Sequence, residues 1–197
     1  TTQRTKRDMA TEIAATLAFS AIQNNDKIGV IFFSDRIEKY IAPKKGRKHI
    51  LYIIREMLNF EPESKKTDIN AALEFLTRVV KHTCTAFVLS DFYVRSDFEH
   101  VLQIANRKHD VIAVQVYDRR AKELPNVGLM KVCDAETGHE MLVDTSSAKL
   151  RNAYKANWNK LQCQLQAIFT KTNVDNISVA TNDDYVKKLM ILFAQRS

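Results

Sequence analysis

The 197-residue sequence contains few of the residues that interrupt a chain or bend it sharply. It has 4 glycines and 3 prolines, and hydrophobic residues make up 45% of it. That composition is typical of a folded soluble domain and argues against long disordered linkers. Its apolar runs are only a few residues long, so no segment is expected to span a membrane. We therefore expect residues 1–197 to form a single domain.

Cysteine is also scarce and shows no metal-binding or redox spacing. Cys84, Cys133 and Cys163 are odd in number, lie far apart and form no C-x-x-C pair. This excludes a disulfide framework and favours buried, reduced thiols in a cytoplasmic protein.

Several enzyme and nucleic-acid signatures are missing. There is no G-x-S-x-G, no phosphate-binding G-x-x-x-x-G-K-[ST], no glycine-rich dinucleotide turn and no evident Cys/His pair. The net charge of +7 comes from scattered basic residues without interleaved aromatic side chains. A solvated surface explains that charge best, with an acidic protein partner or a polyanion as the alternative.

One short apolar run stands out in this background. Residues 86–89 (A-F-V-L) are bounded by polar residues and end at Ser90-Asp91, a pattern typical of a strand buried on both faces. Ligands of open α/β sheets bind outside the carboxyl ends of the strands. Asp91 is thus either a ligand-site residue or merely the cap of the following loop.

Strand and helix patterns alternate along the chain. We expect strands at 28–33, 36–41, 86–89, 110–117, 129–133, 141–143 and 176–180, and helices at 5–24, 50–58, 68–80, 96–105, 146–170 and 185–193. The second strand follows the first after two residues, so this pair is antiparallel. The remaining order predicts a mostly parallel sheet with one antiparallel edge strand and helices on both faces.

Several segments resemble a known bacterial family. They are T-E-I-A-A-T-L-A-F-S-A-I-Q-N-N-D-K-I-G-V-I-F-F-S-D-R-I-E, P-K-K-G-R-K-H, T-D-I-N-A-A-L, S-D-F, R-K-H-D-V-I-A-V and V-D-T-S-S. In this order they resemble the family catalogued as domain of unknown function 58, which is similar to von Willebrand factor type A domains. The resemblance implies a three-layer, Rossmann-like fold.

The resemblance also implies a metal-ion-dependent adhesion site. In type A domains a D-x-S-x-S loop, a threonine and an aspartate hold a divalent cation that also binds a carboxylate of the partner. By this resemblance, Thr67 of the present sequence corresponds to the threonine ligand, and Asp91 corresponds to the aspartate ligand. Mg²⁺ suits such a site because it takes oxygen ligands and keeps several waters. The competing interpretation of Thr67, or of Asp68, is a helix N-cap.

The sequence departs from that family pattern because no D-x-S-x-S is present in residues 1–197. By resemblance, this loop follows a central strand that comes before Thr1. We therefore expect a fragment with an incomplete site that binds Mg²⁺ poorly or not at all, with Mg²⁺ as a candidate ligand of the full-length protein. The strands at 28–33 and 86–89 would then flank a slot, closed by direct pairing, by another chain as in a homodimer, or by further residues.

These observations leave three hypotheses on function. The first is a non-enzymatic protein-interaction module, with a MoxR-type AAA ATPase implied by the resemblance as its partner. The second is a metal-dependent hydrolase that uses Asp91. The third is a polyanion or nucleic-acid binder, although no nucleic-acid motif supports it. His82 and His109 are interpreted as surface or structural histidines.

Overall fold

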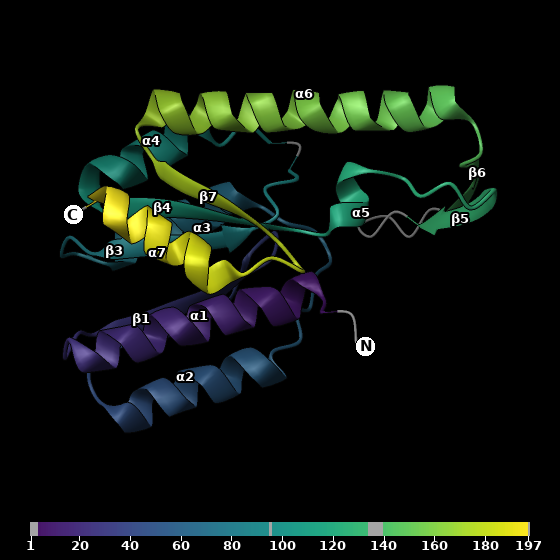
Figure 1. Cartoon of the computed structure of the whole chain (residues 1–197). Coiled ribbons are helices and arrows are strands. Elements are labelled where there is room, and N and C mark those ends of the chain that lie inside the picture. Colours follow the sequence, from purple (N-terminus) through teal and green to yellow (C-terminus); the bar gives the residue numbers. More distant parts are fainter. Residues whose placement is uncertain (1–3, 95, 134–139, 197) are drawn as a thin grey trace.

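The computed structural model describes residues 4–94, 96–133 and 140–196 and shows a mixed α/β fold (Figure 1). Its elements are α1 (Lys6–Gln23), β1 (Ile28–Phe33), β2 (Ile37–Lys44), α2 (Arg47–Asn59), α3 (Ile69–Val79), β3 (Thr85–Ser90), α4 (Glu99–Lys108), β4 (Asp110–Tyr117), α5 (Arg119–Lys122), β5 (Leu129–Cys133), β6 (Glu140–Asp144), α6 (Ala148–Thr172), β7 (Asp175–Ala180) and α7 (Tyr185–Arg196).

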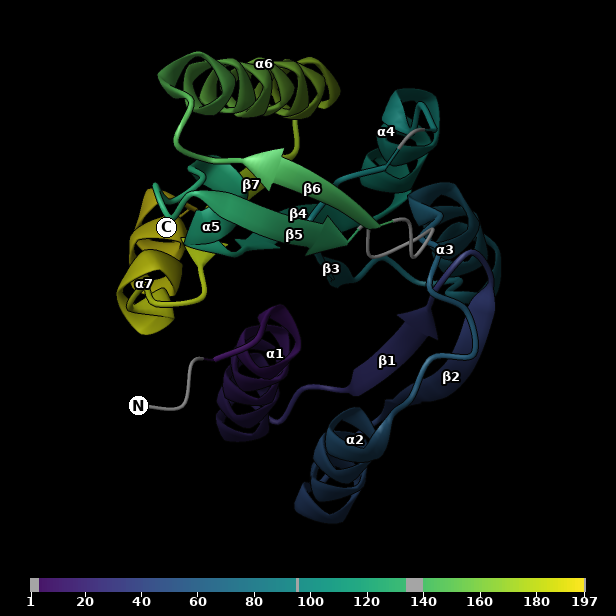
Figure 2. The same ribbon diagram turned by 90° about the vertical axis from the view of Figure 1, so that its right-hand side faces the viewer.

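The strands form three separate sheets. The largest has the order β3-β4-β7, with all strands parallel, and β4 lies in its centre. An antiparallel pair, β1-β2, lies beside it, and a second antiparallel pair, β5-β6, projects from one end (Figures 1 and 2). The parallel pairing of the strands at 86–89, 110–117 and 176–180 is confirmed, as is the antiparallel pairing of the first two strands. The single mostly parallel sheet is not observed, because the described strands form three separate sheets. The strands at 129–133 and 141–143 also pair, and the loop between them at 134–138 lies outside the described residues.

Helices cover both faces of the parallel sheet because β4 is apolar on both sides. Val111 and Ala113 face a cluster that includes residues of α3, α4 and α6. Ile112 and Val114 face the opposite cluster, with residues of α1 and α7. Alternate residues of a strand point to opposite faces, so the D-V-I-A-V-Q-V-Y sequence of β4 creates both halves of the core.

Local chemistry fixes the start of α1 and the β1-β2 pair. Thr5 and Asp8 form a reciprocal capping box that satisfies backbone N–H groups at the helix start. In β1, Gly29 lies where the register shifts, and a Cβ there would stand 2.7 Å from the carbonyl oxygen of Ile41. Because Gly29 has no Cβ, it permits the close approach of β1 and β2 at this position.

The interpretation of residues 86–89 as a strand buried on both faces is wrong for the described structure. The β3 strand lies at the edge of its sheet and none of its residues is fully buried, whereas six consecutive residues of β4 are. The expectation that the strands at 28–33 and 86–89 pair directly with each other is also wrong. Among the described residues, β1 pairs with β2, and β3 pairs with β4.

Two element bounds differ from those expected. The second strand runs to Lys44 rather than ending at residue 41, so Pro43 lies inside β2, which an edge strand tolerates. The α4 helix starts after Phe98 rather than at residue 96, and it has no side-chain cap. The α6 helix is buried only near its end, at Leu165, Phe169 and Thr172, because its first half extends beyond the parallel sheet (Figure 1).

The cysteine prediction holds only in part. Cys84 and Cys163 are free thiols, but Cys84 is half-buried and Cys163 is exposed on α6. The expectation of buried thiols is therefore wrong for Cys163. Among the described residues, no helix combines the length and apolarity needed to cross a bilayer.

Packing against α3 provides a test of this core. Leu73 on α3 is 1% exposed, whereas Leu51 on α2 is 49% exposed. We expect Leu73→Ala to lower the free energy of unfolding by about 2–5 kcal/mol, because it leaves a cavity. The matched change Leu51→Ala should cost less than about 1 kcal/mol. Urea unfolding measures both, and equal losses would contradict the described core.

Candidate functional site at the carboxyl edge of the sheet

Asp91 follows the last residue of β3 and is held in a tight turn. Its Oδ1 accepts a hydrogen bond from the backbone N–H of Tyr93 at 3.1 Å. Between them Phe92 adopts a positive φ of 55°, an uncommon conformation for a non-glycine residue. The buried Phe92 ring packs against Phe98 and Phe169, with centroids 6.0 and 5.3 Å away. Packing of this ring therefore maintains a strained turn.

A buried polar chain fixes the backbone of Asp91 from the other side. Gln115, which is 2% exposed on β4, donates a hydrogen bond from Nε2 to the Asp91 carbonyl oxygen at 3.2 Å. Its Oε1 accepts a hydrogen bond from Ser178 Oγ on β7 at 2.8 Å. The position of Asp91 is thus tied to all three strands of the parallel sheet.

The second carboxylate oxygen of Asp91 meets a lysine. Lys6 Nζ, from the first turn of α1, lies 2.6 Å from Asp91 Oδ2. The Lys6 side chain is 52% exposed and that of Asp91 is 33% exposed. An ion pair this open to solvent contributes little to stability, about 0–1 kcal/mol. A cation or a partner group could displace Lys6 at a small cost.

Thr67 precedes the amino end of α3, which lies at the same edge of the fold. Asp68, not Thr67, is the N-cap, and its side chain accepts from the Asn70 N–H at 2.9 Å. The Asp68 N–H donates to the Ser34 carbonyl oxygen beyond the end of β1 at 2.8 Å. Within the described chain no hydrogen bond holds the Thr67 hydroxyl, which leaves it free to bind.

Asn70 connects this helix start to the loop that follows Asp91. Its Nδ2 donates to the Asp97 carbonyl oxygen at 3.2 Å, while its buried Oδ1 has no partner among the described groups. The ends of β1 and β3 and the start of α3 therefore share one edge, the carboxyl edge. It brings together the loops that carry Thr67 and Asp91, although no hydrogen bond joins these two side chains in the described structure.

Metal ligands are sparse at this edge. The described residues hold no group of three or more His, Cys, Asp or Glu side chains that could bind a metal ion. Thr67 and Asp91 supply two oxygen donors of different kinds, one hydroxyl and one carboxylate, which is part of the near-octahedral shell that Mg²⁺ requires. The residues described thus fit a part of a Mg²⁺ shell, not a complete one.

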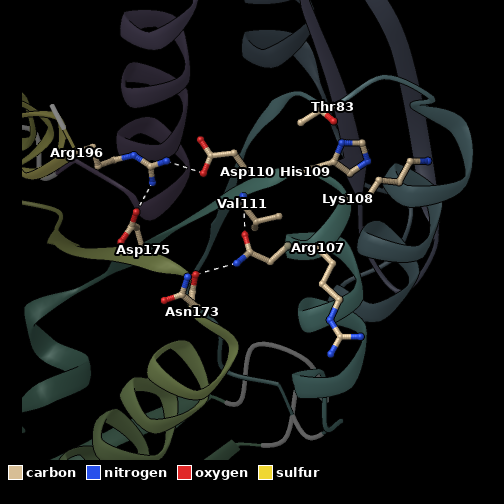
Figure 3. Close-up of a pocket in the computed structure, with 10 residues that line it drawn as sticks. Thr83, Arg107, Lys108, His109, Asp110, Val111, Asn173, Asp175 and Arg196 are labelled. Carbon is tan, nitrogen blue, oxygen red and sulfur yellow. Dashed lines mark hydrogen bonds and ion pairs between the residues drawn. The ribbon is translucent and has the colours of Figure 1, made fainter.

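A hollow of about 480 Å³ lies at the opposite, amino edge of the parallel sheet (Figure 3). Its charged lining is largely satisfied internally. Arg196 Nη2 lies 2.5 Å from Asp110 Oδ1, and its other terminal nitrogen pairs with Asp175. Asn106 donates to the Asn173 carbonyl oxygen at 2.8 Å. These ion pairs and hydrogen bonds connect β4, β7 and α7, which indicates a structural role for the residues that line the hollow.

His109 and Cys84 form an unexpected pair beside this hollow. Cys84 Sγ lies 3.5 Å from His109 Nδ1, and His109 is 2% exposed with no described partner for Nε2. Burial, helped by the charge of Lys108, lowers the pKa of His109. Burial and the Asp110 carboxylate raise the pKa of Cys84. Both groups are thus held neutral, which suits a structural contact rather than an activated nucleophile.

Sequence reasoning missed three contributors to these two edges. In the sequence Lys6 is one basic residue among many. Its partner Asp91 lies 85 residues further along the chain, so no local pattern connects them. Gln115 did carry a signal, because it is the one polar side chain inside the apolar core of β4. The Cys84–His109 contact joins two positions that no local pattern connects.

Comparison with protein families gives one match over most of the chain. Residues 1–163 match a family described as protein of unknown function DUF58. Uncharacterised proteins of Mycobacterium bovis and Mycobacterium tuberculosis are each 27% identical over 135 residues, 68% of this chain and 43% of theirs. The chain thus spans less than half the length of these relatives. One from Mycobacterium avium is 32% identical over 95 residues, 47% of this chain and 54% of its own.

Two solved structures share the arrangement of elements. One is the conserved hypothetical protein BatB from Bacteroides thetaiotaomicron, with a TM-score of 0.56 and 14% identity, covering 94% of this chain and 87% of its own. The other, an aerotolerance-related membrane protein from Bacteroides fragilis, has a TM-score of 0.59 and 16% identity, covering 93% and 86%. At these identities the likeness shows the fold alone.

The lowered pKa of His109 predicts a dependence of stability on pH. The unfolded chain takes up a proton at this residue as the pH falls below about 6.5, whereas the folded chain resists it. The free energy of unfolding should therefore fall between about pH 7.5 and about pH 5.5. His109→Phe should weaken this fall, and His100→Phe, at an exposed histidine, should retain it. Urea unfolding at both pH values measures the difference, and an unchanged slope for His109→Phe would contradict it.

Proposed function

The chain belongs to the family of proteins of unknown function DUF58, and on that basis we propose that it is a non-enzymatic protein-interaction module. Its contact surface is the carboxyl edge, with Asp91 at the centre. The partner implied by the resemblance is a MoxR-type AAA ATPase, and the place of action is the cytoplasm. The proposal rests mainly on one observation: buried Gln115 holds the backbone of Asp91, while among the described residues the carboxylate pairs with one cation, the half-exposed Lys6.

That combination suits recognition better than structural support. A carboxylate whose only ionic partner among the described residues is half-exposed gains little from staying paired, yet the fold fixes its position through Gln115 and the buried Phe92 ring. Rigid placement lowers the entropy lost when a partner binds. A basic side chain of a partner, or a cation bound by a partner's carboxylate, could then replace Lys6.

Mg²⁺ belongs to this proposal only in the full-length protein. Thr67 and Asp91 would supply two of the oxygen ligands, and the partner's carboxylate and water would supply others. The unpartnered Oδ1 of Asn70 shows that a further oxygen acceptor at this edge is unsatisfied. Because the residues described here fit the cation incompletely, no step of the proposed interaction depends on it in the 197-residue chain.

The hydrolase alternative draws no specific support from the contacts of Asp91. Among the described residues its side chain is bonded to Lys6 and to the Tyr93 N–H, and to no histidine, cysteine or second carboxylate. The polyanion alternative still rests on the net charge of +7 alone.

A binding experiment tests the central residue. The full-length protein is immobilised and offered the purified MoxR-type AAA ATPase of the same organism, with Mg²⁺ or with EDTA. Asp91→Asn should weaken capture by about tenfold or more, equivalent to at least about 1.4 kcal/mol. Lys6→Gln should leave it equal or stronger, since it removes the competing ammonium group.

Asp26→Asn serves as the control, since this exposed carboxylate lies in the turn between α1 and β1, away from the carboxyl edge. Capture that is indifferent to both Asp91→Asn and EDTA would refute the proposed surface and its cation together. Loss with Asp91→Asn alone would retain the surface without the metal.

The 197-residue chain itself should respond little to Mg²⁺. A ligand that binds only the folded state must raise the melting temperature, and the donors described here are too few for tight binding. We expect no resolvable change in melting temperature at low-millimolar Mg²⁺, measured by differential scanning fluorimetry. An upward shift of several degrees that is lost in Asp91→Asn would show a more complete site than Thr67 and Asp91 provide.

A further inference from the structure

The longest helix of the described chain carries charge of one sign only. The 25 residues of α6 include four lysines and one arginine but no aspartate or glutamate. In both Figure 1 and Figure 2 this helix forms one outer side of the molecule, and none of the described elements lies beyond it. Its first half extends past the parallel sheet (Figure 1). Part of the net charge of +7 therefore lies on an exposed, projecting element.

Three of the five cations of α6 bind groups of the fold itself. Lys155 Nζ lies 3.1 Å from Glu123 Oε1, and Lys171 Nζ lies 2.6 Å from Glu99 Oε1. Arg151 donates from Nη1 to two backbone carbonyl oxygens just before α6, at 2.6 and 2.8 Å. These three side chains thus connect α6 to its surroundings.

Lys149 and Lys160 are different, because both are exposed and neither has a hydrogen bond or an ion pair with another described residue. Lys149 also lies in the first turn of α6, which contains no acidic residue. The positive end of the helix dipole disfavours a cation there by about 0.3–1 kcal/mol. The stability of the described fold therefore explains neither lysine.

The two lysines lie on a helix side that combines positive charge with amide groups. At 3.6 residues per turn, the side turned away from buried Leu165 and Phe169 carries six exposed residues, which we call the α6 outer face: Lys149, Asn152, Ala153, Ala156, Asn159 and Lys160. The amides of Asn152 and Asn159 form no hydrogen bond within the described chain. The two alanines between them leave room for a ligand to approach the helix closely.

Duplex DNA matches the shape and the chemistry of the α6 outer face. An α-helix with its side chains is about 10–12 Å across, and the major groove of B-DNA is about 12 Å wide. Lys149 and Lys160 lie about three turns apart, about 16 Å along the helix axis. Between them are side chains of the types that read bases, since asparagine pairs with the edge of adenine and alanine contacts the methyl group of thymine.

Other polyanions match this face less well. Single strands bind through aromatic side chains that stack on bases, and the six residues of the α6 outer face include no aromatic one. The major groove of an RNA duplex is too narrow to be read by side chains. An acidic protein would need only the two lysines, whereas base edges also use the amides between them.

We propose that the α6 outer face binds the major groove of duplex DNA, with Lys149 and Lys160 on phosphates and Asn152 and Asn159 toward base edges. The phosphate contacts supply most of the affinity, and the amides supply a preference for A·T pairs. Two phosphate contacts make a weak complex. We expect a dissociation constant of about 10⁻⁴–10⁻⁶ M, the range of non-specific DNA binding.

Fluorescence anisotropy of the 197-residue chain with a labelled duplex of about 16 base pairs tests the lysines. Lys149→Gln combined with Lys160→Gln should weaken binding by about tenfold or more at about 100 mM NaCl. The slope of log affinity against log salt should fall by about 2, since each phosphate contact contributes about 0.9. Circular dichroism should show the same helix content as in the unmodified chain, because both side chains are exposed.

The matched control removes the same charge elsewhere. Lys45 precedes α2 and Lys48 lies in its first turn, and both are exposed and unpaired among the described residues. Lys45→Gln combined with Lys48→Gln should change the affinity by less than about twofold. A loss equal to that of the outer-face pair would assign binding to net charge and overturn the proposal. A dissociation constant above about 10⁻³ M at about 50 mM NaCl would also overturn it.

The two asparagines are tested by base preference rather than by affinity. The unmodified chain should bind an A·T-rich duplex about fivefold or more tighter than a G·C-rich duplex of equal length. Asn152→Ala combined with Asn159→Ala should abolish this preference and leave the salt slope unchanged. Equal affinity of the unmodified chain for both duplexes would overturn the placement in the major groove.

Competition identifies the class of ligand. Unlabelled duplex DNA should displace the probe at a lower concentration of negative charge than single-stranded DNA, duplex RNA or poly-L-glutamate. Displacement by any of these three at an equal or lower concentration would overturn the assignment to duplex DNA. The inference does not depend on the proposed interaction function. Asp91→Asn should leave DNA binding unchanged, so failure at α6 and failure at the carboxyl edge are distinguishable.

Discussion

Side-chain packing of two helices, rather than a backbone ladder, joins the two main sheets of this protein. The α1 helix inserts Met9 and Ile13 against the parallel sheet and Ala14 against the β1-β2 pair. The α3 helix does the same from the other face through Leu73. Apolar packing depends on buried area and tolerates small displacements more readily than hydrogen bonding does. These helices therefore hold the two sheets together, because β1 and β3 do not pair with each other among the described residues.

The carboxyl edge depends on this packing and on one polar residue. Gln115 is buried in the central strand and must satisfy its amide there, because an unpaired buried polar group costs about 1–3 kcal/mol. It does so by binding the backbone of Asp91 and the hydroxyl of Ser178. A requirement of core stability thus sets the position of a surface carboxylate. Stability and recognition are coupled at this point.

The sequence predicts the bounds of most helices and strands well, but it predicts their burial and their neighbours less well. Period and length alone place β1, β4 and α1 within a residue or two of their observed bounds, because each carries a complete apolar pattern. The same reasoning predicts that residues 86–89 are buried on both faces, whereas β3 is only partly buried, since an apolar run does not reveal which strands lie beside it. Lys6 and the Cys84–His109 pair depend on contacts between distant segments, which no local pattern encodes.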